Sequence, residues 1–188
     1  MNNVKSDEEY LRYLIESNPD KLNWINISSD QILSEDFIRE FQDELIWAGV
    51  CYHQTLSEDL IREFQYKVDW NNISYYQILS EGFIREFQDK VGWRGVSLCQ
   101  ALSEDFIREF QDKVDWNNIS SNQILSEDFM REFQDKLDWQ KISSNQTLSE
   151  EFIREFWYRL NQKDVFIFQD YSEDFEPIKN ISRTTQIF

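Results

Sequence analysis

The sequence has few of the residues that most often build catalytic or ligand-binding loops. Its 188 residues include only 4 glycines, 2 prolines and 1 histidine. The glycines have neither the GxGxxG nor the Walker spacing of phosphate-binding loops. A catalytic centre would combine a nucleophile, a base and an orienting acid, and no such combination stands out from the chain. We therefore predict that the protein is not an enzyme and uses no cofactor.

Long apolar runs, a leader and cysteine motifs are also lacking. No run of eighteen apolar residues and no basic-then-apolar leader occurs, so we expect neither membrane insertion nor secretion. Cys51 and Cys99 are the only cysteines, and they form no CxxC or other metal-ligand spacing. We predict two reduced thiols in a reducing compartment and no metal site.

Basic residues are few in comparison with acidic ones. The chain has 19 Lys and Arg against 36 Asp and Glu, which gives a formal net charge of -17. Affinity for nucleic acid depends on basic residues that neutralise phosphates, so direct nucleic-acid binding is not expected. A neutral or basic protein partner fits this charge better. A hydrophobic content of 40% and an aromatic content of 16% exclude a disordered acidic tail.

What the chain does have is one phrase that returns along nearly its whole length. The phrase is LSEDFIREFQDKVDWNNISSNQI at residues 102–124, and its leucine and tryptophan recur every 23 residues, from Leu33 to Leu148 and from Trp24 to Trp139. A fixed period of this size is typical of a solenoid, in which each repeat buries its apolar face only against its neighbours. The repeats predict one elongated body with a continuous core of Phe, Trp, Ile and Leu.

The first half of the repeat has the pattern of an amphipathic helix. Ser103 is a good N-cap, and the acidic residues after it favour the helix N-terminus. We predict a helix over 103–114, with Glu104–Arg108 and Glu109–Lys113 as ion pairs four residues apart. On that helix, four apolar side chains fall within an arc of about 100°: Phe106, Ile107, Phe110 and Val114.

The second half predicts a turn followed by a short helix of about two turns. The turn falls on a column of residues that cap helices or tolerate positive φ: Asn23, Ile46, Asp69, Gly92, Asp115, Asp138 and Asn161. On a helix, Trp116, Ile119 and Gln123 share one face, whereas on a strand Trp116 and Ile119 would point to opposite faces.

A leucine-rich repeat is the alternative, because 23 residues is a permitted length and ISSNQI resembles its asparagine turn. Only two repeats carry asparagine in that column, however, at Asn122 and Asn145. We favour an all-α solenoid of about six helix-turn-helix repeats with atypical terminal caps. Its predicted parts are an N-terminal cap at 1–23, tandem repeats at 24–160, and a degenerate C-terminal repeat, cap and tail at 161–188.

A glutamine recurs once in every repeat, on the apolar side of the second helix. An unpaired buried amide costs on the order of 1 to 3 kcal/mol. We therefore predict a structural column of hydrogen-bonded amides that joins successive repeats or satisfies helix-end carbonyls. The column consists of Gln31, Gln54, Gln77, Gln100, Gln123, Gln146 and Gln169.

Positions that vary between repeats are the candidates for binding a partner, because stacking fixes the others. They lie just after each tryptophan and just before each glutamine. Aromatic and arginine side chains there are of the types enriched at interface hot spots. The candidates are Tyr52, His53, Tyr75, Tyr76, Arg94, Leu98 and Cys99. Ordinary surface drift without a ligand is the other interpretation.

The repeat with the wording W-x-x-I-S-x-x-Q-x-L-S-E-D-F-I-R-E-F-x-D-K-V resembles uncharacterised tandem-repeat proteins of giant, mimivirus-like DNA viruses. The resemblance covers roughly residues 24–175. It implies a viral origin, and a place in the host cell cytoplasm or the virion, but brings no catalytic residues.

These observations favour a non-enzymatic repeat scaffold for protein–protein interaction. An acidic nucleic-acid mimic that occupies a basic groove is one alternative, and a structural virion component is another. The partner protein is unknown, and the protein is expected to be a monomer or to associate with itself end to end.

Overall fold

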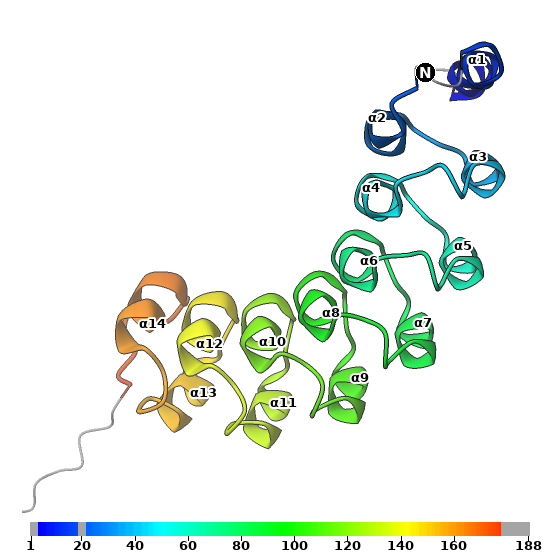
Figure 1. Ribbon diagram of the computed structural model, residues 1–188. Helices are drawn as coiled ribbons and strands as arrows, with labels where there is room; N and C mark the ends of the chain where they lie inside the picture. The colour runs from blue at the N-terminus through cyan, green and yellow to red at the C-terminus, as the bar shows by residue number, and fades with distance from the viewer. Residues whose placement is uncertain (1–3, 19–21, 178–188) are drawn as a thin grey trace, which may run out of the picture. The chain divides into compact units, whose positions relative to one another are not determined.

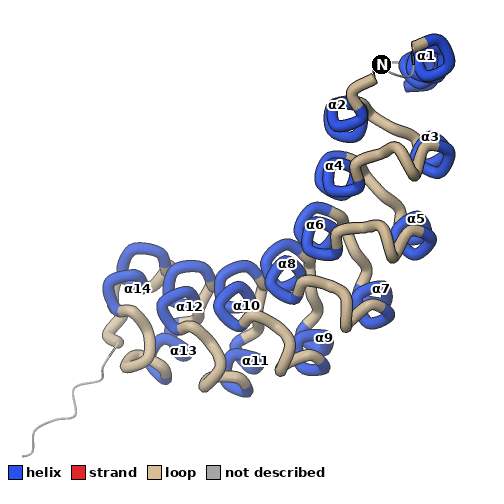
Figure 2. The backbone as a smooth tube through the Cα atoms, viewed as in Figure 1, coloured by secondary structure: helices blue, strands red, loops and turns tan. Residues whose placement is uncertain are grey.

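A computed structural model describes residues 4–18 and 22–177, and within these residues the chain is an all-α repeat solenoid. Figure 2 shows helices and connecting loops, and no strand, in this described part. The leucine-rich-repeat alternative is therefore wrong. The helices are α1 Val4–Ser17, α2 Trp24–Asp30, α3 Glu35–Glu40, α4 Trp47–His53, α5 Glu58–Glu63, α6 Trp70–Tyr76, α7 Glu81–Glu86, α8 Trp93–Cys99, α9 Glu104–Glu109, α10 Trp116–Asn122, α11 Glu127–Glu132, α12 Trp139–Asn145, α13 Glu150–Glu155 and α14 Gln162–Phe168.

The chain divides into two compact units, residues 1–100 and 101–188, where the sequence predicts one continuous body. Within the first unit, α2, α4, α6 and α8 form one row and α3, α5 and α7 form another (Figure 1). Within the second unit, α10, α12 and α14 form one row and α9, α11 and α13 the other. Each repeat thus contributes one helix to each row.

The first helix of a repeat begins as predicted and ends earlier. The Ser103 hydroxyl accepts a hydrogen bond from the Phe106 N–H at 3.2 Å, but the helix ends at Glu109 and not near Val114. The reason is visible two repeats upstream, where the Gln65 amide donates to the Arg62 carbonyl. The Gln65 carbonyl in turn accepts from the Trp70 indole N–H at 3.1 Å. Side chains thus take carbonyls that a continuing helix would bond.

The second helix agrees with the predicted two turns, from Trp to the residue before the glutamine. The predicted turn column supplies its N-caps, as at Asp69, whose carboxylate accepts from two backbone N–H groups. Ile46 and Gly92 stand in the same column without a side-chain cap. No residue in the described chain has a positive φ, so this column serves for capping and not for left-handed backbone.

The core lies between the two rows of helices. The side chains that are fully buried in it come mainly from two neighbouring positions of the first helix and one of the second, as at Phe83, Ile84 and Ile73. The tryptophans that begin the second helices are only partly buried, and their rings lie on phenylalanines, as where the ring centroids of Trp70 and Phe87 are 4.9 Å apart. Burying one such large side chain stabilises the fold by roughly 1.5 to 3 kcal/mol.

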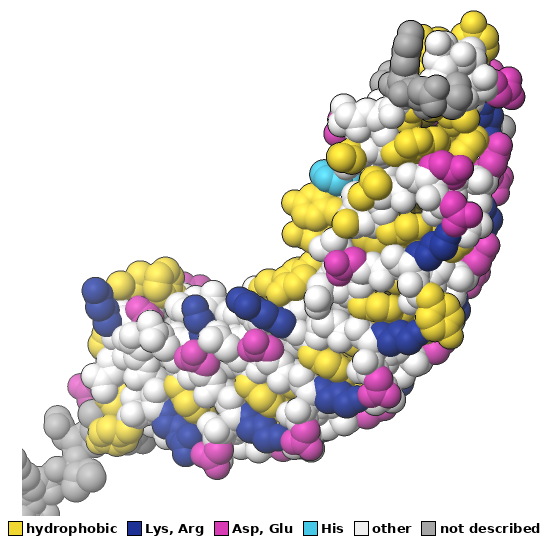
Figure 3. All heavy atoms as spheres, viewed as in Figure 1, with side chains coloured by type: hydrophobic (Ala, Val, Ile, Leu, Met, Phe, Trp, Pro, Cys, Tyr) yellow, Lys and Arg dark blue, Asp and Glu magenta, His cyan; other side chains and the backbone are white. Residues whose placement is uncertain are grey.

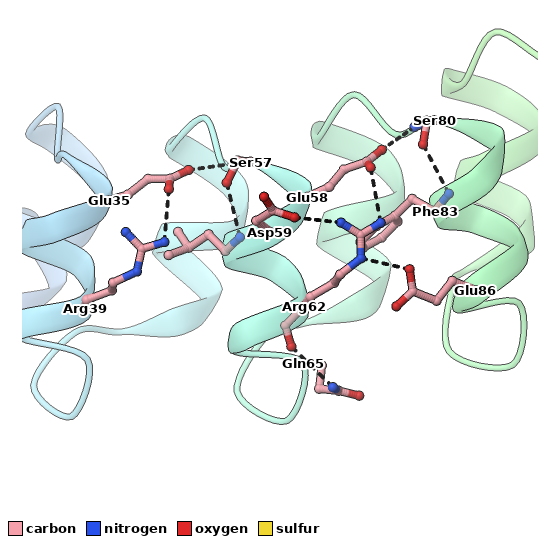
Figure 4. A network of polar contacts seen from close by, with 11 residues as sticks. Glu35, Arg39, Ser57, Glu58, Asp59, Arg62, Gln65, Ser80, Phe83 and Glu86 are labelled. Carbon is pink, nitrogen blue, oxygen red and sulfur yellow. Dashed lines mark hydrogen bonds and ion pairs between the residues drawn. The ribbon is translucent and has the colours of Figure 1, made fainter.

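Within each of the two units, an arginine on a first helix connects its repeat to the next one, as Arg62 does in Figure 4. The Arg62 guanidinium donates to Glu86 of the following repeat at 2.8 Å and to Asp59 of its own helix at 2.9 Å. Its centre lies 5.0 Å from the centroid of the Phe83 ring. Charge and aromatic surface therefore stabilise the same contact between repeats.

One of the two ion pairs predicted within a helix is confirmed. Glu104 and Arg108 are paired at 3.5 Å. The equivalents of Glu109 and Lys113 in the next repeat are Glu132 and Lys136, and both bond backwards, to Arg108 and to the Gln111 side chain. In that repeat, these two side chains therefore form contacts between repeats.

Helix α1 takes the place of a first helix, although its spacing differs from the repeat. Glu8 accepts from Ser34, 26 residues later, as Glu35 accepts from Ser57, 22 residues later. Arg12 pairs with Glu40 and lies over the Phe37 ring at 5.2 Å. The predicted N-terminal cap is thus a repeat helix with a connection about four residues longer.

At the C-terminal end, the described residues include the beginning of one further repeat. The Ser172 N–H donates to Glu150 at 2.8 Å, and Phe175 lies 4.9 Å from the Arg154 guanidinium. Register is thus kept as predicted. Over residues 171–177 the chain forms no helix, and Ser172 and Phe175 instead close a single turn. Residues 178–188 of the predicted tail lie outside the described residues.

Candidate interaction surface

Within each of the two units, glutamines of the column bond a second helix to the repeat before it. The Gln77 amide donates to the carbonyls of Cys51 at 2.9 Å and Gln54 at 2.8 Å, while its oxygen accepts from the Leu56 N–H at 2.9 Å. Gln54, Gln100, Gln146 and Gln169 make the same three bonds to their own preceding repeats. The Gln123 oxygen accepts from Leu102 N–H, and Gln31 is exposed.

A buried serine column fixes the same helices from the other side. The Ser74 hydroxyl donates to the Trp70 carbonyl at 2.6 Å and accepts from the Gly92 N–H at 2.8 Å. Helices α6 and α8 approach each other closely here, because a Cβ on Gly95 would lie 3.1 Å from the Ser74 Cβ. Positions that face the neighbouring repeat are therefore constrained, and only the outward positions of the second helices are free to vary.

The structure brings four of the candidate binding residues into one aromatic cluster, which we call the tyrosine patch: Tyr52, His53, Tyr75 and Tyr76. The rings of Tyr52 on α4 and Tyr76 on α6 are 4.1 Å apart, and His53 lies 4.4 Å from Tyr52. Tyr52 and Tyr76 keep 48% and 49% of their surface exposed. In Figure 3 hydrophobic side chains gather beside the single histidine.

Helix α8 extends this surface. A Cβ on Gly95 would lie 3.0 Å from the Tyr75 ring, so Tyr75 packs against this helix. Arg94 and Leu98 are both exposed and, four residues apart, share one face of α8. Cys99 is exposed at the end of the helix. The candidate surface therefore runs over α4, α6 and α8 within the first unit.

The tyrosine hydroxyls influence one another. A hydrogen bond with the neighbouring Tyr52 hydroxyl, together with partial burial, raises the pKa of Tyr76 above its ordinary value. The Tyr76 phenol therefore stays neutral in the physiological range and can donate or accept hydrogen bonds. Hydroxyls on apolar rings combine hydrogen-bonding groups with contact area, an arrangement that suits binding.

The two cysteines have different surroundings. Cys51 takes the place of serine in the buried column, and burial raises its pKa to about 11. Cys99 is exposed, with a pKa raised by a smaller burial. Cys99 is the more reactive thiol, because it is exposed and because the thiolate, which is the reactive form, is harder to form at the buried Cys51.

We expect a maleimide at about pH 8 to label Cys99 rapidly and Cys51 only on unfolding. Since the folded pKa of Cys51 exceeds the ordinary thiol value, this group favours folding below that value. Its contribution is lost as pH rises towards about 11. Mass spectrometry of the labelled peptides checks the order, and equally fast labelling of both would contradict it.

Sequence reasoning missed a second column of glutamines, which follows the first helix: Gln42, Gln65, Gln88, Gln111 and Gln134. Their backbone carbonyls accept from the tryptophan indoles. The Gln65 side chain also accepts from Lys90 of the next repeat at 2.7 Å. The recurrence of this glutamine in five successive repeats could have indicated the second column from the sequence, as the same kind of recurrence indicated the first.

Fold and surface together define a class, the all-α tandem-repeat solenoid with a variable outer helix face. Comparison with protein-family models, with curated proteins and with solved structures finds no match. Among the described residues, no helix has the length and apolar character needed to cross a membrane.

Proposed function

We propose that the protein is a non-enzymatic scaffold that binds another protein through the tyrosine patch and the adjoining face of α8. The observation that carries the proposal is the contact between Tyr52 and Tyr76, whose exposed rings meet across two repeats. Exposed tyrosine clusters offer large contact area at low conformational cost and are typical of interface hot spots.

The contrast between repeats supports the proposal. The columns of Tyr75 and Tyr76 contain serine and asparagine in the later repeats, as at Ser121 and Asn122. Those later residues bond to their own helix, with the Ser121 hydroxyl donating to the Asn117 carbonyl at 3.0 Å. The fold therefore accepts small polar residues here, and stacking does not require the aromatic rings.

A matched exchange tests the patch. We expect the double substitution Tyr75→Ser and Tyr76→Asn, which copies Ser121 and Asn122, to abolish capture of partner proteins and leave the thermal midpoint within a few degrees. Quantitative mass spectrometry after affinity capture compares it with the unaltered chain and with a Ser144→Ala, Asn145→Ala control. Equal capture by all three proteins would refute the proposed surface.

The acidic nucleic-acid mimic remains a second candidate, favoured by one observation. Within each described unit, aspartates lie almost fully exposed at repeat spacing, as with Asp105 and Asp128. Binding through them should weaken steeply as salt rises, whereas binding through tyrosines should change little. A salt titration of the captured complex separates the two.

The resemblance to giant-virus repeat proteins supports a viral origin, and either the host cytoplasm or the virion as its location.

A further inference from the structure

Arg94, at the start of α8, is the one arginine among the described residues that forms no ion pair. Every other arginine in that part of the chain pairs with a carboxylate. Arg94 is exposed, in a chain with 36 acidic residues against 19 Lys and Arg. The lack of a carboxylate beside it therefore reflects where the acidic residues lie, and not a shortage of them.

The helical carboxylates of the first unit are concentrated on the row of first helices. Helices α3, α5 and α7 each begin and end with a glutamate. Helices α4, α6 and α8 contain no aspartate or glutamate, and Asp30 of α2 is the only carboxylate in the second helices of this unit. The helices that carry the tyrosine patch are thus free of negative side chains, although the whole chain has a net charge of -17.

Helix α8 gains no stability from an arginine at this position. Its N-cap is Gly92, where α6 has the carboxylate of Asp69, so no acidic cap stands beside Arg94. A positive charge in the first turn of a helix is also disfavoured by the helix dipole. The same column contains Asn71 and Gln140 in other repeats, so stacking does not require arginine here.

Arg94 borders the tyrosine patch. The next residue, Gly95, lies against the Tyr75 ring, which a Cβ at this glycine would approach to 3.0 Å. Leu98 follows on the same face of α8 and is 36% exposed. Beyond Tyr75, the ring of Tyr76 reaches that of Tyr52 on α4. An exposed cation without a partner thus adjoins exposed apolar surface.

We propose that Arg94 and the tyrosine patch bind a short acidic segment of another protein, in which an aspartate or glutamate stands close to an aromatic or aliphatic residue. This inference rests on the proposed function and adds the chemistry of the partner. The carboxylate accepts two hydrogen bonds from the planar Arg94 guanidinium, and the apolar side chain packs on Leu98 and the tyrosine rings. One arginine cannot neutralise the several phosphates that nucleic-acid binding requires, so a carboxylate is the better match.

Selection from a random library of linear peptides on the full-length chain tests the proposal. The enriched peptides should share an acidic residue close to an apolar one. Fluorescence polarisation should show binding of the best peptide weakened about tenfold or more by Arg94→Gln, which copies Gln140. Replacing the acidic residue of the peptide by its amide should cost the same, with little further loss when both changes are combined. Lys163→Gln removes the same charge from the same column in the second unit and should leave binding unchanged.

Three results would overturn the acidic partner: enriched peptides without acidic residues, equal binding to Arg94→Gln and the unaltered chain, or a selection that enriches nothing. Tighter binding of fluorescein-labelled oligothymidylate than of every selected peptide would also overturn it, in favour of nucleic acid. If Tyr75→Ser with Tyr76→Asn abolishes peptide binding and Arg94→Gln does not, the tyrosine surface stands and only the acidic partner is wrong. Peptides that bind this tyrosine variant as tightly as the unaltered chain would contradict both proposals.

Discussion

Replacing Gln77 by leucine is expected to lower the midpoint of thermal unfolding by roughly 6 to 12 °C. The substitution leaves three backbone groups without their partner: the carbonyls of Cys51 and Gln54 and the N–H of Leu56. Each unsatisfied buried group costs about 1 to 3 kcal/mol, so the total loss is about 3 kcal/mol or more. Gln100→Leu should behave in the same way, because it makes the same bonds to Ser74, Gln77 and Leu79.

The column offers its own control at Gln31, whose side chain is exposed. Gln31→Leu should change the free energy of unfolding by less than about 0.5 kcal/mol. Calorimetry of the three variants measures the difference. If Gln77→Leu melted at the temperature of the unaltered protein or above it, the buried amides would not be what joins the repeats.

Phe129→Ala is expected to destabilise the second unit by about 3 to 5 kcal/mol. The Phe129 side chain is fully buried, and its ring lies 4.7 Å from that of Phe133 and 5.1 Å from the Arg108 guanidinium. Alanine would leave a cavity and would also remove the ring under the arginine. The cost therefore combines lost packing with a lost cation–π contact.

The matched control is Phe129→Leu, since Leu60 occupies the same column of the repeat and is also buried. We expect this substitution to cost only about 1 kcal/mol. Urea unfolding, followed by circular dichroism, compares the two variants. Indistinguishable free energies of unfolding for Ala and Leu would show that filling the column is not what stabilises the repeat.

Variation between repeats identified the outward positions as candidate binding residues, but it could not show which of these residues lie next to one another. Tyr52 and Tyr76 are 24 residues apart, and nothing local to either residue indicates that their rings lie 4.1 Å from each other. That distance depends on how two helices stack. The two cysteines were both predicted to be reduced thiols, and only the structure shows that Cys51 is buried and Cys99 exposed.

The sequence by itself determined the helical class, the repeat, the serine N-caps and the second helix. These depend on residues within one repeat, since periodicity and capping act over one or two turns of chain.

Only the tertiary structure decided where the first helix ends and which charges meet. The Trp70 indole takes the Gln65 carbonyl, and Arg62 reaches Glu86 of the next repeat. It also decided that α1 is a repeat helix, through Glu8 and Arg12. In each case the physical reason is the same: bonds formed across the packing of helices compete with those that the local pattern predicts.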